Sequence, residues 1–204
     1  MPRLSTLVAA ALLAAGACTP AGSATTVATP MTRATAVAAA GSDDDRYSVY
    51  DLDAEWRDQQ GRPRTLASLR GRPQLVAMIY THCATTCPLT VADMKRIERA
   101  AGAADVGFLL VSLDPDRDSS ARLAAFAREH DLAPERWTLL SGRDDSDVRE
   151  LAAALGVRYR RLSPDELAHS NTLTLLDASG EVAWQRAGLG DDTDVVAAVR
   201  ALQR

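Results

Sequence analysis

Two cysteines four residues apart, Cys83 and Cys87, are the residues whose type and spacing most directly indicate chemistry in this chain. They lie in the segment 80–88, between an apolar, strand-like run and an amphipathic, helix-like one. Sulfurs near a helix N-terminus meet exposed backbone N–H groups and the positive end of the helix dipole, which lower the thiol pKa. The pair is therefore expected to perform either disulfide exchange or soft-metal binding.

A structural disulfide is the alternative interpretation of the two cysteines. Pro88 suits the first position of a helix, which would place the cysteines at the start of that helix. Residues four apart on a helix have Cβ atoms about 5–6 Å apart, whereas a disulfide needs about 3.5–4.5 Å. A bond would require an irregular first turn, so helical spacing favours a functional pair.

Strand and helix patterns alternate from Tyr47 onward, which predicts a sheet covered by helices on both faces. An antiparallel hairpin beside parallel strands is typical of a mixed sheet of thioredoxin-like type. Asp118 is the expected N-cap of the third helical segment. The expected strands are 49–56, 75–80, 106–113, 138–140, 157–160 (at an edge), 172–176 and 182–185, and the expected helical segments are 66–69, 88–101, 119–129, 144–155 and 192–202.

A second polar segment follows the strand at 106–113 and contains Asp114 and Asp116. Sites in open α/β sheets form beyond the carboxyl ends of parallel strands, where the cysteines also lie. The two loops are therefore expected to face one crevice. The carboxylates could form a turn, or they could orient the site and dock a partner.

A histidine is the third candidate residue. Thioredoxin-like oxidoreductases usually place a cis-proline opposite the redox cysteines, before the last pair of strands, but this chain has His169 there and Pro164 comes too early. An imidazole beside two thiolates is a nitrogen and sulfur set suited to copper. His82 is expected to point elsewhere, and His130 to complement a helix end.

These segments together resemble the Sco/SenC family, exported thioredoxin-fold proteins implicated in building the copper site of cytochrome c oxidase. The resemblance covers residues 47 to 190 and rests on four motifs. It implies that Cys83, Cys87 and His169 are copper ligands. Ala84 and Thr174 depart from the residues usual in the family without affecting these three. The motifs are Gly71-Arg72-Pro73, Tyr80 to Pro88 with Cys-x-x-x-Cys-Pro, Ser112 to Asp118, and His169-Ser170 followed by Leu175-Leu176-Asp177.

The function expected from this resemblance is that of a metallochaperone, not an enzyme: Cu(I) or Cu(II) is held by two thiolates and one imidazole and handed to an oxidase subunit or a similar exported copper enzyme. The alternative is a thiol-disulfide reductase that keeps the acceptor's cysteines reduced, with Cys83 and Cys87 as its redox pair. A thiol peroxidase is disfavoured because the cysteines are paired. Structural zinc is disfavoured because such sites use four ligands.

The N-terminal region indicates export and tethering. Residues 1–17 have a positive start, a short apolar stretch and small residues before Cys18, which predicts an export signal of a bacterial lipoprotein with Cys18 as lipid acceptor. Ordinary cleavage nearby or an uncleaved anchor are the alternatives. Residues 18–46 are expected to be a disordered tether, and 47–204 the thioredoxin-like copper-binding domain on the periplasmic side of the membrane.

The charge pattern excludes one class of partner. The net charge is −4, and the 23 basic residues are scattered among 27 acidic ones rather than gathered in a stripe. Nucleic-acid binding is therefore not expected.

Overall fold

The computed structural model describes residues 47–102 and 105–203. The expected export signal at 1–17, the tether at 18–46 and the lipid acceptor Cys18 lie outside the described residues and remain predictions. Within the described part of the chain, no helix combines the length and the apolar character needed to cross a membrane.

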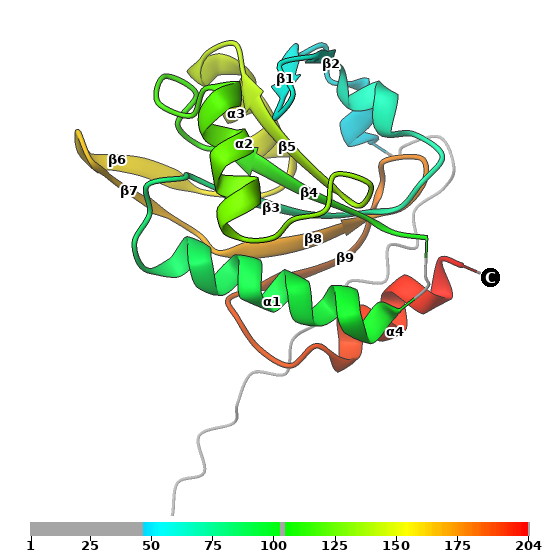
Figure 1. Ribbon diagram of the computed structural model, residues 1–204. Coiled ribbons are helices and arrows are strands. Elements are labelled where there is room, and N and C mark those ends of the chain that lie inside the picture. The colour runs from blue at the N-terminus through cyan, green and yellow to red at the C-terminus, as the bar shows by residue number, and fades with distance from the viewer. Residues whose placement is uncertain (1–46, 103–104, 204) are drawn as a thin grey trace, which may run out of the picture. The chain divides into compact units, whose positions relative to one another are not determined.

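A seven-stranded mixed sheet forms the centre of the fold (Figure 1). Its central strands β3, β4 and β5 run parallel, while β1 and β8 join them antiparallel. Every residue of β3 and β4 is buried, as expected for strands covered on both faces. The thioredoxin-like mixed sheet expected from the sequence is confirmed. In spatial order the strands are β2 (Pro63–Arg64), β1 (Trp56–Asp58), β5 (Trp137–Gly142), β4 (Gly107–Ser112), β3 (Gln74–Ile79), β8 (Thr172–Leu176) and β9 (Val182–Ala187).

Four α-helices pack on this sheet (Figure 1). Helices α1 (Thr86–Ala101) and α4 (Thr193–Ala201) contact each other, with α1 against β3 and α4 against β8 and β9. Helices α2 (Ser120–Glu129) and α3 (Asp145–Ala154) pack on β5. The buried side chains of α1 recur at helical spacing, so burial of this apolar stripe fixes the helix that follows the cysteine loop.

A separate two-stranded sheet, the hairpin of β6 (Tyr159–Ser163) and β7 (Glu166–His169), extends away from the main sheet in Figure 1. The expectation that 157–160 forms an edge strand of the main sheet is therefore wrong, because β6 pairs with β7 instead. β7 was not expected, because only Leu167 among its residues is fully buried and the strand has little apolar alternation.

One other local expectation is wrong. The strand expected at 49–56 is instead a 3₁₀ turn, η1 (Val49–Asp51), followed by irregular backbone, and strand pairing begins only at Trp56. The Ser48 hydroxyl accepts the Tyr50 N–H and so closes this turn, which diverts the chain from an extended path. The short turn expected at 66–69 is confirmed as η2 (Leu66–Leu69).

Helix starts also differ in detail from the expectation. Helix α1 begins at Thr86, so Pro88 is its third residue rather than its first. The N-cap of α2 is Ser119, whose side chain accepts the Arg122 N–H at 3.3 Å, and not Asp118. The Asp118 carboxylate is turned inward and has other partners.

Candidate functional site

The loop between β3 and α1 holds both cysteines at the carboxyl edge of the parallel strands. Cys83 lies before the helix, where its N–H donates to the Tyr80 carbonyl at 3.2 Å, and Cys87 lies in the first helical turn. The helical distance that argued against a disulfide therefore does not apply to Cys83. Both thiols are free and buried.

The Cys83 sulfur accepts hydrogen bonds at the start of α1. The backbone N–H of Cys87 points to Cys83 Sγ at 3.4 Å, and the Thr86 hydroxyl lies 3.6 Å from it. Thr85 occupies the N-cap position but makes no side-chain capping bond. The sulfur thus takes the role that an oxygen usually has at a helix N-terminus.

These contacts give the two thiols opposite acidities. Burial pushes the pKa of Cys83 up, but the backbone N–H groups of Cys87 and Thr85 and the Thr86 hydroxyl more than offset it, and the pKa falls to about 6. Burial raises the pKa of Cys87 well above its usual range, and the neighbouring Cys83 thiolate adds to this. At neutral pH Cys83 is therefore a thiolate and Cys87 a thiol.

The hairpin brings His169 to the cysteines. His169 ends β7, and its Nε2 lies 3.7 Å from Cys87 Sγ. Its Nδ1 lies 3.2 Å from the Ser170 carbonyl, a contact that requires a proton on Nδ1 and leaves the Nε2 lone pair facing the sulfur. Burial lowers the pKa of His169, although the Ser170 carbonyl opposes this, so the ring is neutral at pH 7.

The described residues contain no group of three or more His, Cys, Asp or Glu side chains already arranged to enclose a metal ion. Cys87 and His169 face each other, and the Cys83 sulfur accepts the Cys87 N–H and also hydrogen-bonds to the Cys87 side chain. Two thiols and a neutral imidazole are nevertheless the donor types that a soft or borderline metal prefers. The Cys83 sulfur can take part while keeping its helix contacts, because a metal-bound thiolate still accepts N–H hydrogen bonds.

The structure separates the two carboxylates expected to act together. Asp114 is buried, and Arg161 of β6 donates to its Oδ1 at 2.8 Å and to its Oδ2 at 3.4 Å. His82 Nε2 lies 3.5 Å from Asp114 Oδ2. Asp116 is exposed and lines a cavity of about 570 Å³ together with Tyr159. Of the two, Asp114 alone contacts the cysteine loop.

Asp118 joins the two loops in a way that the sequence did not reveal. Its carboxylate accepts the Thr81 N–H at 3.0 Å, the Thr81 hydroxyl at 2.5 Å and the Ser112 hydroxyl at 2.6 Å. The signal was present in the sequence, since Ser112 ends a buried apolar strand where a hydroxyl needs a partner. These bonds confirm that the loops after β3 and β4 face each other.

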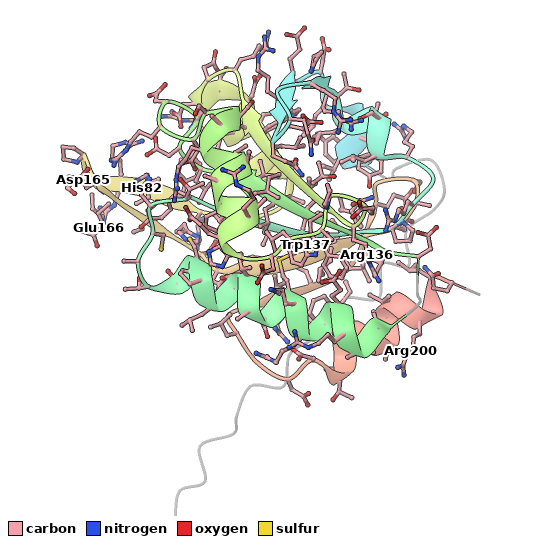
Figure 2. The ribbon with its side chains drawn as sticks, in the orientation of Figure 1. His82, Arg136, Trp137, Asp165, Glu166 and Arg200 are labelled. Carbon is pink, nitrogen blue, oxygen red and sulfur yellow. The ribbon has the colours of Figure 1, made fainter. Side chains whose placement is uncertain are left out.

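Aromatic rings complete the surroundings of the site. Tyr80 makes edge contacts with His82 and His169, with ring centroids 4.7 Å and 5.9 Å apart. Figure 2 labels His82 together with Asp165 and Glu166, which mark the tip of the hairpin. The hydroxyl of Thr90 on α1 donates to Asn171 Oδ1 at 2.9 Å, which ties the chain after His169 to the helix that carries Cys87.

Known proteins resemble this chain in sequence and in fold. A SCO1 protein homolog from Bacillus subtilis is 28% identical over 131 residues, which are 62% of this chain and 68% of that protein. The solved structure of BsSco, a member of the Sco family of cytochrome c oxidase assembly proteins with a disulfide switch, is 26% identical and covers 80% of this chain and 97% of its own, with a TM-score of 0.68.

A structure of Bradyrhizobium japonicum ScoI with copper bound shares the fold at 24% identity, covering 73% of this chain and 96% of its own with a TM-score of 0.62. The family model for SCO1/SenC matches residues 47–204, which is more than half of the chain. That match spans the cysteine loop, the Asp114 loop and the hairpin with His169, and it shows that this chain belongs to the SCO1/SenC family.

Proposed function

We propose that this protein binds copper through Cys83, Cys87 and His169 and delivers it to an exported copper enzyme, with an oxidase subunit as the acceptor. The observation that carries the proposal is the approach of His169 Nε2 to Cys87 Sγ at 3.7 Å, with the nitrogen lone pair facing the sulfur. Copper as the metal is supported by the family and by the copper-bound relative.

The three side chains have complementary protonation states for this cargo. Cys83 is already a thiolate at neutral pH, because its pKa is about 6. His169 is a neutral ring with a free Nε2. Cys87 must lose a proton, which makes loading release about one proton near pH 7. Two thiolates suit Cu(I), and the added imidazole suits Cu(II).

Transfer is proposed to proceed by ligand exchange with the acceptor. The ligands lie at the loop edge of the sheet, where Ala84, Thr85 and Thr86 are exposed beside the buried sulfurs. An acceptor cysteine that approaches this edge can replace the protein ligands one at a time, so that the metal is never released into water. The donor of copper is not indicated by the described residues.

A thiol-disulfide reductase is the second candidate, and the unequal acidity of the two thiols favours it. The Cys83 thiolate would attack one sulfur of an acceptor disulfide, forming a mixed disulfide and releasing the acceptor's other thiolate. Cys87 would then lose its proton and attack Cys83, which yields the Cys83–Cys87 disulfide and a fully reduced acceptor. An external dithiol must reduce the pair again. The disulfide switch of BsSco is consistent with this chemistry.

The proposed location is the periplasmic side of a bacterial membrane. Residues 1–17 would direct export, Cys18 would carry the lipid, and 18–46 would tether the folded part. Cys18→Ser should abolish lipid labelling and release the protein from membranes. Retention of this variant would indicate an uncleaved anchor instead.

The deciding experiment is metal analysis of protein purified from the periplasm under reducing conditions, with Cys87→Ser and His130→Ala variants beside it, since His130 lies at the end of α2 and outside the site. Copper near one equivalent in the wild type and in His130→Ala, with loss in Cys87→Ser, supports the metallochaperone. If the wild-type protein is metal-free, does not take up Cu(I) and turns over disulfides rapidly, the result contradicts the metallochaperone and supports the reductase.

A further inference from the structure

The hairpin that carries His169 has little apolar support. Only Leu167 of its residues is fully buried, and neither strand packs extensively on a helix or on the main sheet. A two-stranded hairpin is marginally stable in isolation. Beyond the chain that leads into β8 at Thr172, the position of His169 therefore depends on the polar contacts that attach β6 and β7 to the rest of the described structure.

The register of the hairpin shows which side chains face inward. Tyr159 pairs with His169 and Arg161 pairs with Leu167. Paired residues share a face, and residues two apart on a strand share it as well. The face that carries His169 is thus the one that carries Arg161, whereas Arg160 lies on the opposite face and is exposed.

Arg161 makes the contact with the most buried partner. The Asp114 side chain is 1% exposed, and it meets the Arg161 guanidinium at two points, 2.8 and 3.4 Å. The other attachments use exposed carboxylates or the backbone: Arg117 binds Asp165 at 2.8 Å and the Pro164 carbonyl at 2.7 Å, and the Tyr159 hydroxyl donates to Asp145 at 2.6 Å. Solvent screens exposed pairs strongly, while a buried carboxylate depends on its partner.

Asp114 also lies against the cysteine loop. Its Oδ2 is 3.5 Å from His82 Nε2, and His82 immediately precedes Cys83. One buried carboxylate thus lies between the hairpin that carries the imidazole and the loop that carries the sulfurs. The Arg161–Asp114 pair thus connects the hairpin to the carboxylate that contacts His82, beside the direct contacts of the Leu167 backbone with Tyr80 and of His169 with Cys87.

We propose that Arg161 and Asp114 are positioning residues for His169: their ion pair holds the hairpin against the cysteine loop and so fixes the imidazole beside Cys87. The inference rests on the proposed function, in which His169 is a copper ligand. Without the pair, the hairpin moves away from the site more often, and the nitrogen donor is lost before the two sulfurs are.

The test compares Arg161→Gln with Arg160→Gln, a matched control on the outer face of the same strand, and with Arg161→Lys, which keeps the charge. The first readout is hydrogen exchange of the β7 amides in metal-free protein. We expect exchange at Leu167 and Ala168 to rise by about tenfold in Arg161→Gln, to stay at the wild-type rate in Arg160→Gln, and to be partly restored in Arg161→Lys.

The second readout is the nitrogen hyperfine splitting in the electron paramagnetic resonance spectrum of the Cu(II) protein. Arg161→Gln should lose this splitting and bind Cu(II) about tenfold more weakly, with Cu(I) affinity within about threefold of wild type because both thiolates remain. Asp114→Asn should behave in the same way if it folds. Arg161 is half-exposed, so Arg161→Gln is the variant expected to keep the fold.

The outcomes separate the inference from the function on which it rests. Unchanged β7 exchange together with an unchanged Cu(II) spectrum in Arg161→Gln would overturn the positioning role. A wild-type spectrum without nitrogen would instead remove His169 from the ligand set and overturn the copper proposal. In that case the exchange rates still decide whether Arg161 places the hairpin.

Discussion

The acidity of Cys83 can be tested through one hydroxyl group. Thr86 is the first residue of α1, and its Oγ1 lies 3.6 Å from Cys83 Sγ, while the N–H of Cys87 provides a separate contact at 3.4 Å. Thr86→Val removes the hydroxyl but keeps the size and branching of the side chain. We expect this change to weaken the thiolate without disturbing the helix N–H groups.

The magnitude follows from the number of contacts that remain. A hydrogen bond to a charged group contributes about 1.5–3 kcal/mol, and the long sulfur contact places this one at the lower end. One pKa unit corresponds to about 1.4 kcal/mol, so the pKa of Cys83 should rise by about one unit. At pH 6 the thiolate fraction should fall from about one half to about one tenth.

The carbon NMR shift of Cys83 Cβ, followed against pH in metal-free protein, reports this site alone. Thr85→Val is the matched control, because its hydroxyl lies 4.0 Å from the sulfur and should have the smaller effect. An unchanged midpoint in Thr86→Val would assign the low pKa to the backbone N–H groups and the helix dipole. A wild-type midpoint near the free-cysteine value would refute the reasoning altogether.

Three further predictions concern the metal and the loops. Copper should bind only the dithiol form, because a Cys83–Cys87 disulfide removes both thiolates; stoichiometric Cu(I) binding to protein whose disulfide is verified by mass spectrometry would point to another site. His169→Ala should weaken Cu(II) far more than Cu(I) and leave the melting temperature nearly unchanged, as competition titrations and calorimetry can show; equal Cu(II) affinities would exclude His169 as a ligand. Asp118→Asn should lower the free energy of unfolding by about 2–3 kcal/mol in urea titrations, because an amide cannot accept all three of its hydrogen bonds. Asp116→Asn changes an exposed residue and should alter the free energy of unfolding by no more than about 0.5 kcal/mol. Equal losses of stability in Asp116→Asn and Asp118→Asn would contradict the role given to Asp118.

Stability should also depend on pH through Cys83. Its folded pKa, about 6, lies below the value near 8.5 of an unfolded cysteine. A lowered acid pKa stabilises the fold once the pH exceeds the unfolded value, and the contribution is lost as pH falls from about 8.5 to 6. The difference in the free energy of unfolding between metal-free wild type and Cys83→Ser should therefore shrink as the pH falls across this range. A constant difference between them would contradict the lowered pKa.

The central strands and the meeting of two loops could be predicted because their signals are local. Continuous apolar runs predict the first and last residues of β3 and β4 to within about two positions, the usual uncertainty for the ends of strands and helices. Parallel strands then bring Cys83 and Asp114 to one edge of the sheet. Pro88 and the apolar spacing after it predict the helix, and the structure moves its start by two residues.

The remaining features depend on contacts between distant residues. Arg161 and Asp114 are 47 positions apart, and no local sequence pattern around either residue predicts their contact. Asp118 has the sequence signal of an N-cap, but Thr81 and Ser112 compete for its carboxylate and Ser119 caps the helix instead. β7 is held by polar attachments, so apolar periodicity could not reveal it.

The position of the Cys83 sulfur at the start of α1 affects both the affinity for copper and the ease of its release. On the proposed transfer, the helix N–H groups and the metal share the charge of the Cys83 thiolate, so loading weakens the hydrogen bonds that departure restores. Hydrogen bonds to a charged acceptor contribute about 1.5–3 kcal/mol each, so the loss of one on loading would lower the apparent affinity by about tenfold. When the metal leaves, the backbone N–H groups at the start of α1 stabilise the negative charge of the Cys83 thiolate. The metal-free protein is thereby stabilised as a product, which favours delivery.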